Sequence, residues 1–329
     1  MIDLRCSVII PAYRAATTIQ RAIDSVLAQT SAAHEILVID DGSPDDLKAL
    51  LQSYGNKVRL ICQENMGAAT ARNVGIELAT GGLLAFLDAD DYWEPEKLQC
   101  HQELHQQFPQ LGLSHSRYFE QLPGTERHIV ETVFPVQPAS LVALSGARSF
   151  SWATAIWTGT VVVPREILGA SRFVSGLEPA EDRDLWVRLL VKAPVYCIPI
   201  PLATAVLEPG SLSRANVARD CTNMLKVVAR HQQLIGMMAT RKWQSHTYYR
   251  WSACTENATE GLRHYIHSAL LWPLPLGRGM MRFPLARLRL LARLLQRIVV
   301  AALTIRFGKS PALGSPALES NALGSDSFP

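Results

Sequence analysis

Four short apolar runs follow one another within the first ninety residues, and each ends at a polar or acidic segment. They cover residues 6–10, 36–39, 58–61 and 83–87. Between them lie helix signals: a capping-box pattern at residues 17–20, a serine–proline start at 43–44 leading to a helix ending near residue 54, and a helical run over 68–79. Apolar strands separated by helices indicate a parallel sheet covered on both faces. We therefore expect an α/β fold, with a mostly parallel sheet sandwiched by helices.

The segments that follow these strands are the ones to search for a site, because ligands of open parallel sheets bind beyond the carboxyl ends of the strands. They read Pro11-Ala12-Tyr13, Asp40-Asp41, Gln63-Glu64-Asn65-Met66-Gly67 and Asp88-Ala89-Asp90-Asp91. Four strand ends therefore deliver at least four carboxylates and an aromatic ring to one rim.

Asp88-Ala89-Asp90 is the candidate metal site. If the chain turns at the strand end, one or both carboxylates can reach a divalent cation. Mg²⁺ or Mn²⁺ takes one or two protein carboxylates and completes its shell with phosphate oxygens and water, which suits a nucleotide diphosphate. The alternative is a solvated acidic loop that caps the helix starting near Glu94. The position after a buried strand favours the metal site.

The other strand ends suggest a nucleotide site. A carboxylate at Asp40 or Asp41 can accept a base N–H or a ribose hydroxyl, and Tyr13 offers a ring on which a base can stack. Asn65 begins a segment that leads to Arg72, which could lie beside the phosphates. Structural alternatives stay open, because the two aspartates can cap the following helix and Arg72 can pair with an acidic loop.

A second group of charged residues opens another expected helix, over residues 181–192. There Asp182 shares a face with Leu185, Trp186, Leu189 and Leu190, whereas Asp184, Arg188 and Lys192 form the opposite face with i,i+4 pairing. The helix dipole favours a carboxylate in the first turn, so Asp182 has a structural explanation. The functional interpretation is a general base held at the cleft, with Trp186 packed beneath it.

In this order the segments resemble the signatures of glycosyltransferase family 2. The matching segments are Ser7-Val8-Ile9-Ile10-Pro11-Ala12-Tyr13, Asp40-Asp41-Gly42-Ser43, Asn65-x-Gly67 with Ala71-Arg72-Asn73, Asp88-Ala89-Asp90-Asp91 and Glu181-Asp182. Thr158-Gly159-Thr160 and Pro209-Gly210-Ser211-Leu212-Ser213 also fit. The resemblance implies a GT-A fold and inverting transfer of a sugar from a nucleotide-diphosphate donor, with a UDP-sugar expected. The acceptor would be a hydroxyl of a glycan or lipid-linked molecule, in cell-surface polysaccharide or lipopolysaccharide biosynthesis.

The resemblance also implies roles for individual residues. By similarity, Tyr13 and Asp41 would contact uracil, Asp40 the nucleoside, and Asp182 would deprotonate the acceptor hydroxyl. The expected donor site comprises Pro11, Ala12, Tyr13, Asp40, Asp41, Asn65, Arg72 and Asp88, and the expected Mn²⁺ or Mg²⁺ site comprises Asp88 and Asp90. One departure is visible: residues 205–208 read Ala-Val-Leu-Glu where many relatives carry Tyr-Arg. Acceptor or diphosphate contacts made there are therefore not carried over.

Three other functions compete with this interpretation. A dinucleotide-dependent oxidoreductase needs Gly-x-Gly-x-x-Gly after the first strand, and a nucleotidyltransferase needs a Gly-rich loop there. Residues 11–16 contain no glycine. A catalytically inactive nucleotide-sugar-binding partner protein stays open as the alternative, although Asp88, Asp90 and Asp182 favour an enzyme.

The two parts of the chain differ in their content of charged residues. Residues 1–225 carry 18 Lys/Arg and 25 Asp/Glu, whereas residues 226–309 carry 14 Lys/Arg and 2 Asp/Glu. We expect a catalytic domain over 1–225, a basic helical region over 226–308 and a disordered tail over 309–329. The basic region has an apolar stripe made of Leu285, Leu288, Leu291, Ala292 and Leu295. This pattern indicates either a helix lying on an anionic membrane surface or a helix packed on the catalytic domain.

Other partners and compartments are less favoured. The basic region lacks any zinc, RNP or helix-turn-helix signature, so nucleic acid is not expected. The six cysteines form no CxxC or Cys/His cluster, which argues against a thiolate metal site or a disulfide framework. The start leaves no room for a signal peptide, and no run reaches about 18 apolar residues. We expect a cytoplasmic protein, peripheral on the cytoplasmic face of the inner membrane if the basic helices bind lipid.

Overall fold

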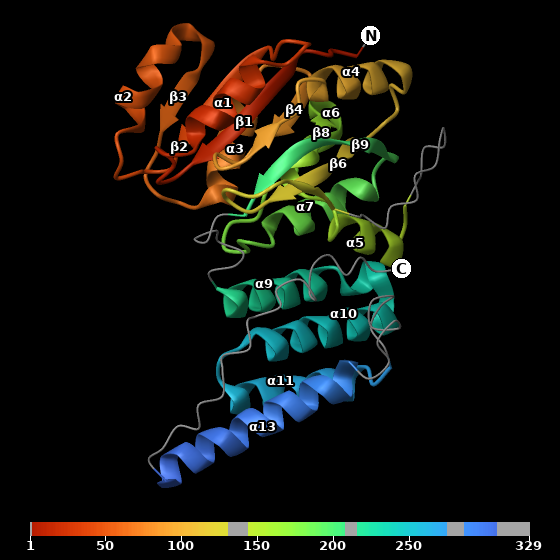
Figure 1. Cartoon of the computed structure of the whole chain (residues 1–329). Helices are drawn as coiled ribbons and strands as arrows, with labels where there is room; N and C mark the ends of the chain where they lie inside the picture. The colour runs from red at the N-terminus through yellow and green to blue at the C-terminus, as the bar shows by residue number, and fades with distance from the viewer. Residues whose placement is uncertain (1, 131–143, 208–215, 275–285, 308–329) are drawn as a thin grey trace. The chain divides into compact units, whose positions relative to one another are not determined.

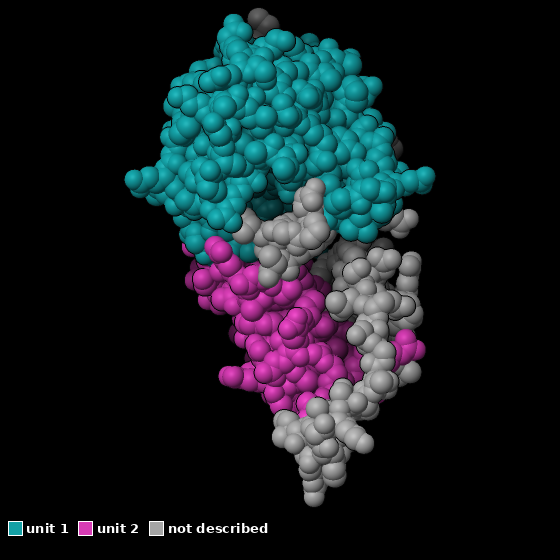
Figure 2. Space-filling view, turned by 60° about the vertical axis from the view of Figure 1, so that its left-hand side comes forward, with its two compact units in different colours: residues 1–212 teal, residues 213–329 magenta. Residues whose placement is uncertain are grey.

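The computed structural model describes residues 2–130, 144–207, 216–274 and 286–307, without the side chains of 302–307. The chain divides into two compact units, Met1–Leu212 and Ser213–Pro329, which Figure 2 colours separately. The division lies before helix α9 (Val217–Arg230), so the expected boundary at residue 225 falls inside this helix rather than between the units. The tail expected over 309–329 lies outside the described residues.

The described part of unit 1 is built on a nine-stranded sheet with the order β3-β2-β1-β4-β8-β6-β9-β5, and β7 pairs with β6. The strands are β1 (Cys6–Ala12), β2 (Glu35–Asp40), β3 (Arg59–Cys62), β4 (Leu83–Phe86), β5 (Tyr92–Trp93), β6 (Leu113–Gln121), β7 (His128–Ile129), β8 (Val162–Pro164) and β9 (Val195–Val206). Strands β1 to β4 run parallel to one another, whereas β8 runs antiparallel to its neighbour β4. The expected α/β class is confirmed.

Helices cover both faces of this sheet (Figure 1). They are α1 (Ile19–Leu27), α2 (Leu47–Leu51), η1 (Gln52–Lys57), α3 (Ala68–Leu78), α4 (Lys97–Gln107), α5 (Ala147–Ala153), η2 (Thr158–Thr160), α6 (Arg165–Leu168) and α7 (Glu181–Leu190). Alternate side chains of β1 point to opposite faces. Val8 and Ile10 share a buried cluster with Ile19 of α1, whereas Ile9 meets Gly75 of α3. Both faces of the strand are therefore buried, which explains the apolar run at residues 8–10.

Two helix starts differ from their sequence signals. The Thr18 side chain makes no capping bond to the helix, and its hydroxyl donates to the Ala15 carbonyl instead. Asp46, not Ser43, caps α2 by accepting the Ala49 N–H at 2.9 Å. The helix expected to run to about residue 54 ends at Leu51, and a 3₁₀ helix follows. Several polar side chains near each helix start can accept the first free N–H groups, and the sequence alone did not show which of them does so.

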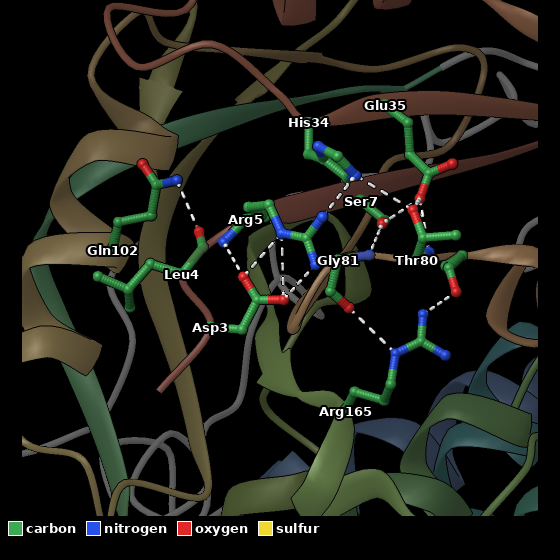
Figure 3. A network of polar contacts seen from close by, with 11 residues as sticks. Asp3, Leu4, Arg5, Ser7, His34, Glu35, Thr80, Gly81, Gln102 and Arg165 are labelled. Atoms are coloured by element: carbon green, nitrogen blue, oxygen red, sulfur yellow. Dashed lines mark hydrogen bonds and ion pairs between the residues drawn. The ribbon is translucent and has the colours of Figure 1, made fainter. Parts of the chain in front are cut away.

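A polar network holds the amino ends of the strands (Figure 3). Glu35 of β2 accepts hydrogen bonds from Ser7 Oγ at 2.7 Å and from the Thr80 N–H at 2.6 Å. Arg165 donates to the Gly81 carbonyl at 3.0 Å. Because β1, β2 and β4 are parallel, these contacts brace the edge opposite the strand ends where the candidate site lies.

Unit 2 is a stack of helices in which each packs on the next along the chain: α9, α10 (Gln232–Cys254), α11 (Ala258–Leu271) and α13 (Ala286–Phe307). No helix among the described residues is long and apolar enough to cross a membrane. On α13 the buried side chains are Leu290 and Leu294, which pack on Tyr265. The expected apolar stripe is therefore not the buried face, since Leu288 and Leu295 are 60% and 46% exposed. Periodicity could not choose the face because α13 is apolar on more than one side.

Candidate active site

The strand ends meet at one rim, as expected. Ala12 is paired with Asp40, and Ile9 with Phe86, so β1, β2 and β4 finish along the same edge. Tyr13 follows β1 and is 46% exposed, with the Arg14 guanidinium 5.2 Å from its ring centroid. An aromatic ring on which a base can stack is thus accessible at the rim.

Asp41 organises the loop that follows β3. Its carboxylate is buried and accepts hydrogen bonds from Gln63 Nε2 at 2.7 Å and from the Met66 and Gly67 N–H groups at 2.8 Å each. Asp40 accepts the Ser43 N–H at 2.9 Å. Neither aspartate caps α2, so the capping alternative is not what the structure shows. Both hold the rim in shape, and a contact to the nucleoside stays a prediction for each.

Arg72 of α3 links two acidic segments. Its guanidinium is buried, lying 2.6 Å from Asp88 Oδ1 and 2.7 Å from Glu181 Oε1. Burial opposes its charge, but the two carboxylates outweigh burial and raise the pKa of Arg72. The alternative in which Arg72 pairs with an acidic loop therefore holds. The arginine also joins the candidate metal carboxylate Asp88 to the first residue of α7.

Asp182 is held in a defined orientation at the start of α7. The Thr158 hydroxyl donates to Oδ2 at 2.9 Å, and the Arg183 N–H donates to Oδ1 at 2.7 Å. Burial raises the pKa of Asp182, although Arg183 and the Thr158 hydrogen bond oppose the increase. Burial likewise raises the pKa of the adjacent Glu181 to about 7, against the opposing effect of Arg72. A carboxylate with a raised pKa is suited to accept a proton near neutral pH.

Two buried side chains brace the turn that carries Thr158. Lys97 Nζ donates to the Thr160 carbonyl at 2.8 Å, and Trp93 Nε1 donates to the Gly159 carbonyl at 2.9 Å. Burial lowers the pKa of Lys97 to about 7. Sequence reasoning did not assign a function to Thr158, Lys97 or Trp93, because these contacts join segments about sixty residues apart. The only signal was that residues 158–160 form part of the family pattern.

The chain turns directly after β4, as a metal-binding role for Asp88 and Asp90 requires. The Asp91 N–H donates to the Asp88 carbonyl at 3.1 Å, and Asp91 Oδ1 accepts the Val206 N–H at 2.8 Å. Burial raises the pKa of Asp91, and the charges of Asp90 and Asp88 raise it further. Arg21 donates to the Asp90 carbonyl. The loop is therefore fixed to β9 on one side and to α1 on the other.

These residues fit a hard divalent cation by their donor chemistry. The described residues contain no group of three or more His, Cys, Asp or Glu side chains that could hold a metal. Mg²⁺ and Mn²⁺ do not need such a group when a diphosphate supplies the remaining oxygen ligands. Asp88 and Asp90 could therefore hold the ion only together with the donor.

One face of α7 was predicted wrongly. Asp184 is fully buried, not part of a polar outer face. Its predicted i,i+4 partner is correct, with Arg188 2.9 Å away. Burial is possible because the helix packs on α5 as well as on the sheet, and Arg188 neutralises the charge. Trp186 packs against both Phe86 and Phe173, with ring centroids 6.0 and 5.7 Å away, and so anchors the helix.

The comparisons agree with this geometry. The model of "Glycosyl transferase family 2" matches residues 7–155. The region that matches, just under half of the chain, belongs to glycosyltransferase family 2. An uncharacterized glycosyltransferase of Nostoc sp., alr2836, is 40% identical over 130 residues, covering 38% of this chain and 40% of that protein. The amylovoran biosynthesis glycosyltransferase AmsB of Erwinia amylovora is 31% identical over 194 residues, covering 57% of this chain and 64% of that protein.

A further curated relative has a more specific name. The UDP-Glc:alpha-D-GlcNAc-diphosphoundecaprenol beta-1,3-glucosyltransferase WfgD of Escherichia coli is 43% identical over 101 residues, covering 30% of this chain and 40% of that protein. The matches to these three relatives thus span between 40% and 64% of their lengths.

Solved structures show the same fold. S. aureus TarS 1-349 in complex with UDP-GlcNAc has a TM-score of 0.61 at 17% identity, covering 93% of this chain and 92% of that one. Mannosyltransferase PcManGT from Pyrobaculum calidifontis, in complex with GDP-Man and Mn²⁺, has a TM-score of 0.54 at 16% identity, covering 93% and 88%. The expected GT-A fold with a helical extension is confirmed.

Proposed function

We propose that this family-2 protein is an inverting glycosyltransferase, which moves a sugar from a UDP-sugar to a hydroxyl of a glycan or lipid-linked acceptor. The observation that carries the proposal is the Asp88–Arg72–Glu181 bridge, with Asp182 next along the chain. It sets a carboxylate suited to a donor's metal and a carboxylate suited to an acceptor's proton on either side of one buried arginine. Transfer between two bound substrates requires two such positions.

The donor assignment is supported by the rim and by related proteins. Tyr13 provides a stacking ring, and Asp40 and Asp41 fix the backbone around it. A TarS structure holds UDP-GlcNAc, and the name of WfgD specifies UDP-Glc. PcManGT holds GDP-Man, so the fold accommodates more than one base. UDP is favoured because WfgD, which is 43% identical over 101 residues, is named for a UDP-sugar, whereas PcManGT is only 16% identical.

The proposed reaction follows from where the charges lie. Asp182 takes the proton of the acceptor hydroxyl on its carboxylate as the hydroxyl oxygen attacks the anomeric carbon. The bond from that carbon to the diphosphate oxygen breaks on the opposite face, so the configuration inverts. Asp88 and Asp90 would hold Mn²⁺ or Mg²⁺, which neutralises charge on the leaving diphosphate. Thr158 keeps the Asp182 carboxylate in one orientation during proton transfer.

The acceptor class rests on the relatives. The name of AmsB places it in amylovoran biosynthesis, and that of WfgD specifies an undecaprenol-diphosphate-linked sugar as acceptor. We therefore propose a role in cell-surface polysaccharide or lipopolysaccharide synthesis.

The test combines a screen with one substitution. Purified protein is incubated with Mn²⁺ and a panel of nucleotide sugars, and release of the nucleoside diphosphate is measured with and without lipid-linked acceptors. Asp182→Asn keeps the shape of the side chain but removes the base, so transfer is expected to be abolished while donor binding stays nearly intact. Near-wild-type transfer by this variant would contradict the base assignment. Donor binding without turnover on any acceptor would favour the alternative, an inactive nucleotide-sugar-binding partner.

A further inference from the structure

Helix α13 has two apolar faces, and only one of them is packed. Leu290 and Leu294 are buried against Tyr265 of α11. A second set of apolar side chains lies on another side of the helix at i, i+4, i+7 and i+11 spacing and is exposed. We call this set the apolar stripe of α13: Leu288 (60% exposed), Ala292, Leu295 (46%) and Val299 (56%). It extends about 16 Å along the helix.

The arginines of α13 also fall into two groups. Arg287 donates to the Trp272 carbonyl at 2.8 Å, and Arg297 to the Thr255 carbonyl at 3.3 Å, so both tie α13 to its neighbours. Arg289 and Arg293 are exposed, and neither forms an ion pair within the described part of the chain. In helical projection, these two lie on the flank of the apolar stripe. The helix contains no acidic residue.

We propose that the apolar stripe of α13 and the flanking Arg289 and Arg293 form a docking surface for an anionic lipid leaflet. An amphipathic helix binds such a surface by inserting apolar side chains to a shallow depth while its cations meet the lipid phosphates. The two exposed arginines supply the positive charge that complements the lipid phosphates. The surrounding basic region contains few acidic residues that would offset this charge. The face differs from the stripe expected from sequence, because Leu291 lies on the packed side.

A second copy of this chain is the other possible occupant of an exposed apolar stripe. In a two-fold contact the same surface meets itself. Arg289 and Arg293 would then approach the same arginines of the other copy, and α13 offers no acid to pair with them. Charge therefore favours lipid over self-association.

The docking proposal adds to the proposed function by bringing the enzyme to acceptors carried on lipids. It is tested without donor or acceptor, so that its failure leaves the transferase assignment intact. The full chain is sedimented with vesicles of phosphatidylcholine alone and with vesicles that also contain phosphatidylglycerol. One variant carries L288Q, L295Q and V299Q, and a second carries R289Q and R293Q. Because all five side chains are exposed, circular dichroism and thermal unfolding should match the wild type.

Matched controls come from elsewhere in unit 2. M237Q with M238Q removes two apolar side chains that are 73% and 72% exposed. R241Q with R263Q removes two exposed cations. We expect the partition coefficient on anionic vesicles to fall roughly tenfold or more in the stripe and Arg289/Arg293 variants, and far less in the controls.

Three results would overturn the docking proposal. The wild-type protein could fail to bind anionic vesicles, or the control variants could lose as much binding as the stripe variants. A dimer in solution that disappears with L288Q, L295Q and V299Q, in the absence of vesicle binding, would assign the surface to a second copy instead.

Discussion

The Thr158 hydroxyl donates a hydrogen bond to Asp182 Oδ2 at 2.9 Å, which joins the 3₁₀ helix η2 to the first turn of α7. The bond stabilises the charged form of a carboxylate whose pKa is raised by burial. Because η2 is itself fixed by Lys97 and Trp93, the hydroxyl acts from a rigid support. Thr158 is therefore a positioning residue for the proposed base.

Replacing Thr158 by valine removes the hydroxyl and keeps the shape. We expect kcat at neutral pH to fall roughly tenfold, the factor that corresponds to one lost hydrogen bond. Without the bond the pKa of Asp182 rises further, and the base works only when ionised. The acidic limb of the pH–kcat profile should therefore move to higher pH, which a pH series of initial rates measures.

Serine at position 158 is the matched control for the valine variant. It retains the hydroxyl, so the position of the acidic limb should stay as in the wild type. A valine variant whose rate drops equally at every pH would show that Thr158 serves only the fold.

Arg72 is expected to contribute strongly to stability. Glu181 Oε2 is buried with no hydrogen-bond partner in the described structure, so Arg72 alone balances that carboxylate. Arg72→Met should lower the free energy of unfolding by about 3–5 kcal/mol, because Glu181, whose pKa is already raised to about 7, must then either take up a proton or stay charged without a counterion. Adding Glu181→Gln should restore part of the loss, since the neutral amide needs no counterion. Urea unfolding of the single and double variants measures this coupling.

A surface pair provides the comparison for Arg72. Arg172 binds Glu77, whose side chain is 64% exposed. Arg172→Met should cost much less than Arg72→Met, because exposed ion pairs contribute little. Strict additivity of Arg72→Met and Glu181→Gln would argue that the two side chains do not depend on each other.

Much of unit 1 could be predicted from local sequence. The apolar runs at β1, β2 and β4 are buried on both faces, whereas the edge strand β3 is only partly buried. A strand buried on both faces has few alternatives to a parallel sheet. The position of the rim then follows from topology, because parallel strands finish at one edge. The register between Ala12 and Asp40 confirms that inference.

Contacts between distant segments could not be predicted in this way. Nothing near Thr158 in the sequence indicates Asp182, since the contact arises only when η2 is fixed over α7. The helical wheel placed Asp184 outside because it assumes one packed face, whereas α7 packs on two sides. Leu290 and Leu288 of α13 are equally apolar, and only the position of Tyr265 decided which one is buried.

A buried histidine predicts how stability depends on pH. His105 Nε2 lies 2.9 Å from Ser114 Oγ, and burial lowers the pKa of His105 to about 4. Below about pH 6.5 the unfolded chain binds a proton at this residue, but the folded chain does so only below about pH 4. The free energy of unfolding therefore falls as the pH drops through this window, by roughly 2 kcal/mol at pH 5 from this group.

Substituting His105 by glutamine isolates this contribution. Glutamine does not titrate and can still hydrogen-bond to Ser114, so its packing cost is read at pH 8. Between pH 8 and pH 5 the variant should lose roughly 2 kcal/mol less stability than the wild type. Equal losses in urea unfolding at the two pH values would show that His105 is protonated in the folded protein.

Chelation and substitution of the acidic loop should act on the same step. If Asp88 and Asp90 hold the cation together with the diphosphate, removal of divalent ions with EDTA should weaken UDP-sugar binding by roughly tenfold or more. The reason is that the ion then no longer links these carboxylates to the phosphates. Asp90→Ala should weaken donor binding to a similar degree and also reduce the increase in donor affinity on adding Mn²⁺. Isothermal titration of the donor, with and without Mn²⁺, measures both effects. Donor affinity that is unaffected by EDTA, yet lowered by Asp90→Ala, would mean that Asp90 binds the donor directly and not through a metal.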